Sequence, residues 1–476
     1  MEKNKNRALI TNPARKTTTR AQARANKNSP RGRLDVLGLT MLGIGGAVGS
    51  GIFVASGMAV NQAGPAIILS FIVGGILSTL VMIMLGEMSV HEPTSGSFSV
   101  YAGEYLGPAL GFISGWIYWL AGILTLSTEM VAAALTVRFW LPAWPVWLIS
   151  LIIAALIIGV GLLNVRAFAR VEEILSFIKV GVLLIIIIMG AIILSDLWPG
   201  IKSPGVTNFL GHGGLFPHGF TGVLTSLLLV LYAYAGEQVI GPATGDTRHP
   251  VNTIPEAIGA INIILAVLYL GSITVLVGLV PWARVPQKAS GFVFLFRYLG
   301  MYAITGIINA VILIAILSAM NSNMYGVPRM LKSLAERHDA PSFLAKNNRA
   351  DVPLPAVLAS SVCLLIVVGV SYLLPQNIFA YIASASGVTL LLNWLIIAIT
   401  HIRFRLKTAH DPKIRRPKAS GFPYKAAAAI VLLLVILGTA ALSVNQLVGL
   451  AVSLILTLVF AGFYFFLIRK RHPAGT

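Results

Sequence analysis

The sequence is poor in charged residues and in cysteine. Asp, Glu, Lys and Arg make up 11% of its 476 residues, whereas soluble domains carry about 25%. A single cysteine, Cys363, excludes an internal disulfide and a cysteine-based zinc site. Hydrophobic residues make up 57% of the chain and the mean hydropathy is +0.85. These values exclude intrinsic disorder and argue strongly against a soluble fold.

Motifs of nucleotide-binding and hydrolytic enzymes are also missing. The glycine run that begins at Gly43 has Val48 where a GxGxxG motif needs its third glycine, and no strand precedes it. The chain has no GxxxxGK[ST] and no GxSxG motif, and Pro93 after Glu92 rules out HExxH. We therefore expect no direct ATP hydrolysis, no cofactor and no enzymatic activity.

Long apolar runs fill most of the chain. About 20 apolar residues in a helix cross the hydrocarbon core of a bilayer, and runs such as Val180–Leu194 lack the alternation of barrel strands. The sequence predicts an all-α integral membrane protein with twelve transmembrane helices. They lie near 37–60, 65–90, 108–137, 146–164, 174–195, 219–241, 257–281, 300–327, 355–374, 377–401, 426–443 and 447–468.

The distribution of Lys and Arg gives the expected orientation. With the amino terminus inside, the inner segments hold 30 of the 35 basic residues and the outer segments hold 5. This positive-inside bias predicts that both termini are cytoplasmic. The net charge of +19 is then a topology signal, and we expect no nucleic-acid partner. No cleavable signal is expected, because residues 1–35 are polar and basic.

The predicted organisation has six parts. They are a basic cytoplasmic tail (1–35), a first five-helix repeat (36–195), an extracellular loop (196–218), a second inverted repeat (219–404), a basic cytoplasmic loop (405–425) and two peripheral helices (426–470).

Two predicted helices contain interruptions at corresponding positions. The first, at 43–51, has five glycines in nine residues, and each glycine costs a helix about 1 kcal/mol relative to alanine. The second, at 234–238, precedes Gly241-Pro242 in the sixth span. The two interrupted helices are five spans apart. Because five is an odd number, the second half enters the membrane from the opposite side. Such a pair is typical of secondary transporters with a binding site at the midplane. Close helix packing through small residues is the alternative explanation of the first run.

Ordered motifs along residues 35–405 resemble one family of transporters. The sequence resembles the amino acid transporter family of the amino acid–polyamine–organocation superfamily. The matching motifs are GIGGAVGSGIF (43–53), Gly64-Pro65, GEM (86–88), EPTSGSF (92–98), GFISGW (111–116), GDTRHP (245–250), Asn321-Ser322, Arg329-Met330-Leu331 and Ala340-Pro341. The resemblance implies the leucine-transporter-like fold, with two inverted five-helix repeats and broken helices 1 and 6. It also implies amino acid uptake, commonly with protons.

An amino acid substrate brings a carboxylate and an ammonium group, and both need partners when buried. Amide groups at a half-helix start suit the carboxylate, and freed carbonyls suit the ammonium. By resemblance, the amides of Gly49, Ser50 and Gly51 hold the carboxylate. The expected ammonium partners are the carbonyls of Ala47, Tyr232 and Ala235. We expect Tyr232 or Tyr234 to form an aromatic lid, with Gly236 also at the site.

Ionisable residues within spans are functional candidates. Glu129 is common in the family and is expected to contact substrate or a proton, whereas Glu87 is expected to be structural. Glu237 departs from the family, which places its acid where this chain has Gln238. If Glu237 faces the cavity, it could pair with lysine, arginine, ornithine or a diamine; otherwise the substrate is a neutral amino acid.

Lys179 in the fifth span is the candidate for proton coupling. Proton-coupled members resemble this chain in placing a lysine there, where an ammonium can donate to the carbonyls around Gly43–Gly46. The alternative is that Lys179 snorkels to the surface beside Glu172.

The resulting prediction is a secondary transporter in the cytoplasmic membrane that imports an amino acid by proton symport and alternating access. An amino acid or polyamine exchanger of the same fold is the main alternative. A channel, a receptor and an intramembrane enzyme are remote ones. The sequence does not indicate an oligomeric state.

Overall fold

The computed structural model describes residues 34–162, 165–287, 289–349, 352–373, 378–409 and 421–468. Most of the predicted basic tail 1–35, and 410–420 of the predicted basic loop, lie outside the described residues. The described chain is helical throughout, with one isolated bridge between Leu34 and Thr247 and no strand. This confirms the predicted all-α class.

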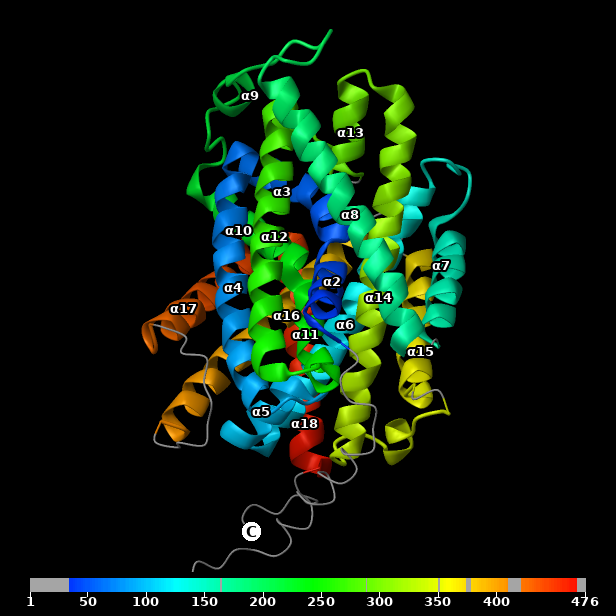
Figure 1. The fold of residues 1–476 in the computed structure, drawn as a ribbon, viewed down its shortest axis with the longest axis vertical. Coiled ribbons are helices and arrows are strands. Elements are labelled where there is room, and N and C mark those ends of the chain that lie inside the picture. Colours follow the sequence, from blue (N-terminus) through cyan, green and yellow to red (C-terminus); the bar gives the residue numbers. More distant parts are fainter. Residues whose placement is uncertain are drawn as a thin grey trace, which may run out of the picture.

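The helices follow the apolar runs of the sequence (Figure 1). They are α2 (Val36–Ala47), α3 (Ser56–Ala63), α4 (Ile67–His91), α5 (Ser97–Tyr105), α6 (Pro108–Val137), α7 (Val146–Gly161), α8 (Val165–Leu194), α9 (Thr207–Leu210), α10 (Gly219–Tyr234), α11 (Ile240–Ala243), α12 (Pro250–Leu279), α13 (Gly291–Tyr298), α14 (Tyr302–Glu336), α15 (Leu354–Leu373), α16 (Ile378–Lys407), α17 (Tyr424–Thr439) and α18 (Val444–Phe463).

Nine helical segments in the described part of the chain are long and apolar enough to cross a membrane. The first of them, Val36–His91, contains the first two predicted spans. Two shorter apolar helices, Val146–Gly161 and Leu354–Val370, lie at the predicted fourth and ninth spans. Every predicted span therefore has an apolar helix, while the count of twelve crossings stays a prediction.

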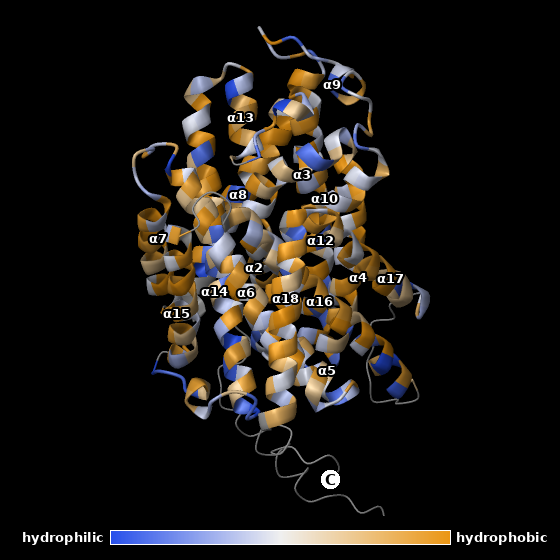
Figure 2. Ribbon diagram, turned by 180° about the vertical axis from the view of Figure 1, so that it is seen from behind, coloured by the Kyte–Doolittle hydropathy of each residue, from blue (hydrophilic) through white to orange (hydrophobic). Residues whose placement is uncertain are grey.

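The outer surface of the bundle is apolar over its middle (Figure 2). Large hydrophobic side chains stand exposed on helices that face outward, such as Ile185 and Ile188 on α8 and Leu458 on α18. An exposed apolar belt of this kind is incompatible with water and suits lipid. We call the end of the bundle that carries α5 the α5 end, and the opposite end, which carries α9 and α13, the α9 end (Figure 1).

The two interrupted helices run antiparallel through the interior. Leu34, at the start of the first, pairs with Thr247, at the end of the second. Conversely, the backbone of Gly222, near the start of α10, lies against Ala63 at the end of α3. Inverted halves require such an antiparallel pair, while the two five-helix repeats stay a prediction.

The interruption in the first helix is shorter than predicted. The α2 helix continues through Gly43, Gly45 and Gly46 to Ala47, and regular helix is lost only around 48–50 before a π-helical turn at Gly51–Ala55. The prediction that the run 43–51 interrupts the helix is therefore wrong for its first three glycines. A Cβ on Gly45 or Gly46 would lie 2.1 Å or 2.3 Å from atoms of neighbouring elements, so those glycines allow close packing.

The second interruption lies where the sequence places it. The α10 helix ends at Tyr234, a 3₁₀ turn covers Ala235–Val239, and the short α11 follows at Ile240–Ala243. The second interruption touches the last turn of α2: a Cβ on Gly236 would lie 1.8 Å from the carbonyl oxygen of Gly46. Only glycine at both positions allows this approach of backbone to backbone.

Candidate functional site

Ser50, Glu129 and Tyr232 form a buried polar cluster at the first interruption. The backbone amide of Ser50 donates to both carboxylate oxygens of Glu129, at 2.9 Å and 3.2 Å. The Tyr232 hydroxyl lies 3.0 Å from Ser50 Oγ and donates to Glu129 Oε1 at 3.3 Å. All three side chains are at most 3% exposed. The protein's own carboxylate thus occupies the amide that the sequence analysis assigned to a substrate carboxylate.

Glycine at position 49 makes room for that carboxylate. A Cβ on Gly49 would lie 2.7 Å from Glu129 Oε1. Gly51 has a different neighbour, because its Cβ would lie 2.5 Å from the Cα of Ala233 on α10. The small size of Gly51 therefore serves helix packing in this structure, whereas Gly49 is the glycine that faces the carboxylate.

Tyr269 on α12 joins the two interruptions and was missed in the sequence analysis. Its hydroxyl lies 2.8 Å from the carbonyl oxygen of Ala47 and 2.9 Å from that of Ala233, and its side chain is fully buried. The carbonyl of Ala47 was predicted to accept from a substrate ammonium group. In this structure its donor is the Tyr269 hydroxyl. A single tyrosine in an apolar helix carries no sequence signal that distinguishes it from packing.

The two candidate lid tyrosines have different surroundings. Tyr232 belongs to the Ser50 cluster, as described above. Tyr234 donates instead to the carbonyl oxygen of Phe71 on α4 at 3.1 Å, and its ring packs 5.0 Å from that of Tyr269. Of the two, Tyr232 lies beside the freed amide of Ser50.

Glu237 is buried in the second interruption without a hydrogen-bond partner for either oxygen among the described residues. It lies close enough to Tyr234 and Tyr269 for an electrostatic interaction. The neighbouring Gln238 accepts from Asn393 Nδ2 on α16 at 3.2 Å. The two adjacent side chains therefore have different roles, and only Gln238 links to α16 by a hydrogen bond in the described chain.

Lys179 on α8 reaches the end of α2. Its Nζ donates to the carbonyl oxygens of Gly45 at 2.6 Å and Val48 at 3.3 Å. The side chain is fully buried, which excludes the snorkelling alternative in this conformation. Glu172, two turns earlier on α8, lies 3.8 Å from Nζ. The predicted contact of an ammonium group with carbonyls near Gly43–Gly46 is thus present at Gly45.

Glu87 lies apart from these groups, near the α5 end. It contacts Arg405 Nε at 2.7 Å and His401 Nε2 at 2.9 Å, both on α16. A buried carboxylate with two such partners ties α4 to α16, in agreement with the expected structural role.

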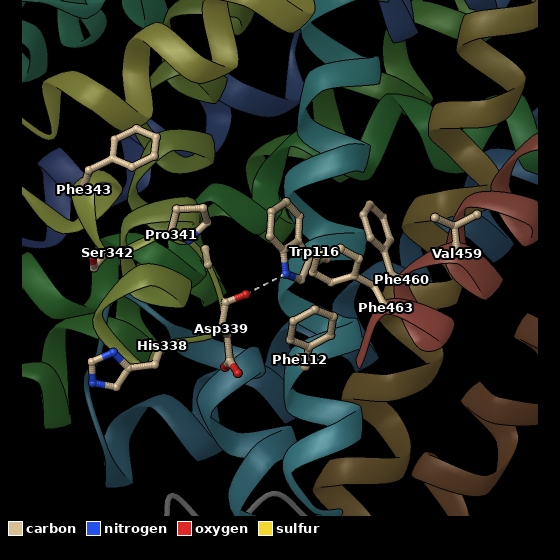
Figure 3. Close-up of a pocket in the computed structure, with 11 residues that line it drawn as sticks. Phe112, Trp116, His338, Asp339, Pro341, Ser342, Phe343, Val459, Phe460 and Phe463 are labelled. Atoms are coloured by element: carbon tan, nitrogen blue, oxygen red, sulfur yellow. Dashed lines mark hydrogen bonds between the residues drawn. The ribbon is translucent and has the colours of Figure 1, made fainter. Parts of the chain in front are cut away.

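Two cavities differ in their relation to the interruptions. One of about 790 Å³ lies near the α5 end between α6, the loop after α14 and α18, and the Trp116 indole donates to the Asp339 carbonyl at its edge (Figure 3). No lining residue belongs to an interrupted helix, so we do not place the site there. The other, of about 240 Å³, is lined in part by Val54, four residues after Ser50, and by Asn309 on α14.

Comparison with known proteins identifies the family. Residues 38–473 match the amino acid permease family. The chain belongs to this family. The gamma-aminobutyric acid permease of Bacillus subtilis (strain 168) is 34% identical over 387 residues, which cover 81% of this chain and 82% of that protein. The aromatic amino acid transport protein AroP of Escherichia coli (strain K12) is 33% identical over 385 residues, covering 81% and 84%.

A third relative spans more of the permease. The uncharacterized amino acid permease YtnA of Bacillus subtilis (strain 168) is 32% identical over 429 residues, which cover 90% of this chain and 93% of that protein. The family and its relatives are transporters and not enzymes. Together with the apolar helices, this makes the chain a multi-pass membrane permease for amino acids.

Proposed function

We propose that this permease imports an amino acid by proton symport and alternating access. The observation that carries the proposal is the hydrogen bonding of Lys179 to the end of α2, next to the amide of Ser50. A titratable cation therefore holds the helix that also presents the candidate substrate amide. Two of the relatives described above are named for gamma-aminobutyric acid and for aromatic amino acids, and these substrates share a carboxylate and an ammonium group.

We place the permease in the cytoplasmic membrane with twelve spans and both termini inside. In this arrangement the α5 end is cytoplasmic and the α9 end is extracellular. Residues 36–195 and 219–404 form the two inverted repeats, with the interrupted helices as the first member of each. The basic residues of 1–35, 405–425 and 469–471 then all lie on the cytoplasmic side.

The substrate carboxylate replaces Glu129 at Ser50. The amide of Ser50 can donate to only one carboxylate at a time, so Glu129 must turn away or weaken its bond when the substrate enters. The substrate ammonium lies near the carbonyl of Ala47, with Tyr232, Ala235 and Gly236 completing the polar part of the pocket. Gly49 keeps the approach free of a side chain, and Gly51 contributes its backbone amide.

Glu237 sets the side-chain preference. A buried carboxylate without a hydrogen-bond partner in the described chain suits a cationic side chain, as in lysine, arginine, ornithine or a diamine. If Glu237 is instead on the proton path, the substrate is a neutral amino acid.

Lys179 couples the proton to α2. In its charged form the ammonium satisfies the carbonyls of Gly45 and Val48. Loss of the proton weakens those bonds and loosens the first helix toward the α5 end. Net movement of substrate then follows the movement of the proton.

The test is uptake into proteoliposomes. Purified permease is assayed with the twenty amino acids and polyamines, with and without an inward proton gradient, and Lys179→Ala is assayed beside it. We expect concentrative uptake only with the gradient, and its loss in Lys179→Ala while some substrate binding survives. Counterflow that is independent of the gradient in the wild type, with no concentrative uptake, would favour the exchanger alternative.

A further inference from the structure

Glu172 is a buried carboxylate that the proposed function does not use. It lies on α8 and its side chain is 2% exposed. Glu172 Oε1 accepts from Ser176 Oγ at 3.1 Å and from Ser318 Oγ at 2.5 Å. Glu172 Oε2 accepts from Asn321 Nδ2 at 2.8 Å. Because burying an unpaired carboxylate is costly, this set of donors indicates that a charged group is kept here.

The partners of Glu172 connect three helices. Ser318 and Asn321 belong to α14, and Ser176 on α8 also donates to the Met41 carbonyl of α2 at 2.9 Å. The α2 backbone comes so close that a Cβ on Gly45 would lie 2.1 Å from Glu172 Oε1. The carboxylate therefore sits at the point where α2, α8 and α14 meet.

Three charged side chains from α6 and α8 contact the first interrupted helix at successive positions. Glu129 on α6 contacts it at Ser50, Lys179 contacts it at Val48 and Gly45, and Glu172 lies beside Gly45. In the described chain, Lys179 is the cation that interacts with both carboxylates. Three side chains of α14 interact with Glu172, and all three are uncharged: Ser318, Asn321 and Ser322. Glu172 thus lies on the α5 side of Lys179, and Glu129 lies on the Ser50 side.

We propose that Glu172 receives the proton of Lys179 and passes it toward the α5 end. This inference rests on the proposed proton symport. In the step, an N–H bond of the Lys179 ammonium breaks and an O–H bond forms on Glu172, which leaves a neutral amine and a carboxylic acid. No net charge is created in the buried site. The proton then leaves Glu172 for water at the α5 end.

The geometry couples this transfer to release of α2. The separation of 3.8 Å between Nζ and Oε1 is longer than a hydrogen bond, which spans about 2.7–3.2 Å. Lys179 Nζ must therefore shift toward Glu172 before the proton can transfer. The neutral amine that remains binds the carbonyls of Gly45 and Val48 less strongly than the ammonium, which loosens the end of α2.

Glu172→Gln tests the relay in proteoliposomes. The side-chain amide of the variant has the shape of the Glu172 carboxylate and can still accept a hydrogen bond from Ser318, but it cannot take up a proton. We expect wild-type counterflow rates with loss of gradient-driven accumulation, which for a one-unit pH gradient can reach about tenfold in the wild type. Substrate-induced proton uptake, followed with a trapped pH-sensitive dye, should be lost as well. Glu172→Asp retains a carboxyl group and should recover part of both signals.

Glu173→Gln is the matched control, because Glu173 is the adjacent, half-buried glutamate on α8. It should behave as the wild type. If Glu172→Gln accumulates substrate as the wild type does, the relay is refuted. It is equally refuted if Gln and Asp variants lose counterflow and accumulation together, because Glu172 is then only structural. If the wild type itself does not accumulate substrate with a gradient, the proposed symport fails, and that result is distinct from the first two.

Discussion

Tyr269 on α12 and Ala47 at the end of α2 are joined by a hydrogen bond of 2.8 Å, and the same hydroxyl reaches the carbonyl of Ala233 at 2.9 Å. A tyrosine hydroxyl has one proton, so it donates to one of these carbonyls at a time. Ala47 is also the carbonyl that we propose for the substrate ammonium. Tyr269 and the substrate ammonium therefore compete for the carbonyl of Ala47 at the end of α2.

Tyr269→Phe should separate stability from substrate binding. Without the hydroxyl, a buried carbonyl is left without its donor, which costs about 1–3 kcal/mol, so the Tm of the substrate-free protein should fall. The substrate ammonium then supplies the missing donor, so the increase in Tm caused by substrate should be larger than in the wild type. Thermal unfolding of purified protein with and without substrate measures both effects.

Tyr234→Phe is the control for this comparison. Tyr234 also loses a buried hydrogen bond, but its acceptor is Phe71 on α4, away from the proposed ammonium position. Its Tm should fall with an unchanged substrate effect. An unchanged substrate effect in Tyr269→Phe would show that the substrate ammonium does not use the carbonyl of Ala47.

Glu129→Gln should strengthen substrate binding. The carboxylate of Glu129 occupies the amide of Ser50, and a charged acceptor binds an amide about twice as strongly as a neutral one. Replacing it with an amide should ease displacement by the substrate carboxylate and lower the Kd by roughly fivefold, which corresponds to ~1 kcal/mol. Equilibrium binding measures the change. A weaker affinity would indicate that Glu129 itself contacts the substrate ammonium.

Glu237→Gln should discriminate between classes of substrate. If Glu237 pairs with a cationic side chain, the variant should lose cationic substrates by two to three decades of affinity, since breaking a buried ion pair costs about 3–5 kcal/mol. Neutral amino acids should bind as before. Competition binding with lysine, arginine, ornithine and neutral amino acids gives the answer, and an equal loss for all of them would assign Glu237 a structural or proton-linked role.

Asp246→Asn should loosen the α5 end of the site. Asp246 Oδ2 accepts from the Tyr325 hydroxyl at 2.6 Å and lies 3.7 Å from Arg329 Nε, while the backbone carbonyl of Asp246 accepts from the amide of Leu34. These contacts hold the end of the second interrupted helix to α14 and to the start of α2. Weakening the two side-chain contacts by ~1 kcal/mol should raise the open population about fivefold.

Cysteine labelling measures this opening. Cys363 is the single cysteine, so Cys363→Ser gives a background without thiols, and Thr244→Cys places a thiol beside Asp246 at a buried position. The thiol should react faster with a soluble maleimide in the Asp246→Asn protein. Asp196→Asn, a change in the loop after α8 at the other end of the bundle, should leave the rate unchanged.

The fold was largely predictable because it follows from apolar runs and helix breakers. Runs such as Val180–Leu194 can only be helices in a bilayer, and the interruption at 234–238 appears where a glycine and two polar residues adjoin Gly241-Pro242. The extent of the first interruption was not predictable. A glycine in the sequence can either break a helix or let a neighbouring element come close, and Gly45 and Gly46 look the same in both cases. Their contacts with Glu172 and Gly236, which only the structure shows, decide for close packing.

The site was predictable in its residues but less so in its contacts. Ser50, Glu129 and Tyr232 were all candidates, yet their mutual hydrogen bonds depend on three helices that lie far apart in the sequence. Tyr269 and the set of donors around Glu172 were missed for the same reason. Each is a common residue in a helix, and its significance comes from partners on other helices.

Gly45→Ala should abolish coupled transport through sterics alone. The added Cβ would lie 2.1 Å from Glu172 Oε1 and 2.6 Å from Ser322 Oγ, so α2 must move away from α8 and α14. That movement takes the Gly45 carbonyl out of reach of Lys179, whose bond to it is 2.6 Å. The helix propensity of alanine, about 1 kcal/mol better than glycine, acts in the opposite direction and is outweighed by the overlap with a rigidly bonded carboxylate.

Gly181→Ala provides the contrast, because Gly181 is also helical and a Cβ there meets nothing within 4 Å. It should transport as the wild type and gain slightly in Tm, whereas Gly45→Ala should lose gradient-driven uptake and have a lower Tm at similar membrane expression. Uptake assays and thermal unfolding of both proteins check this. If Gly45→Ala transports normally, α2 does not need its close contact with Glu172, and the coupling of Lys179 to the first helix would have to work through Val48 alone.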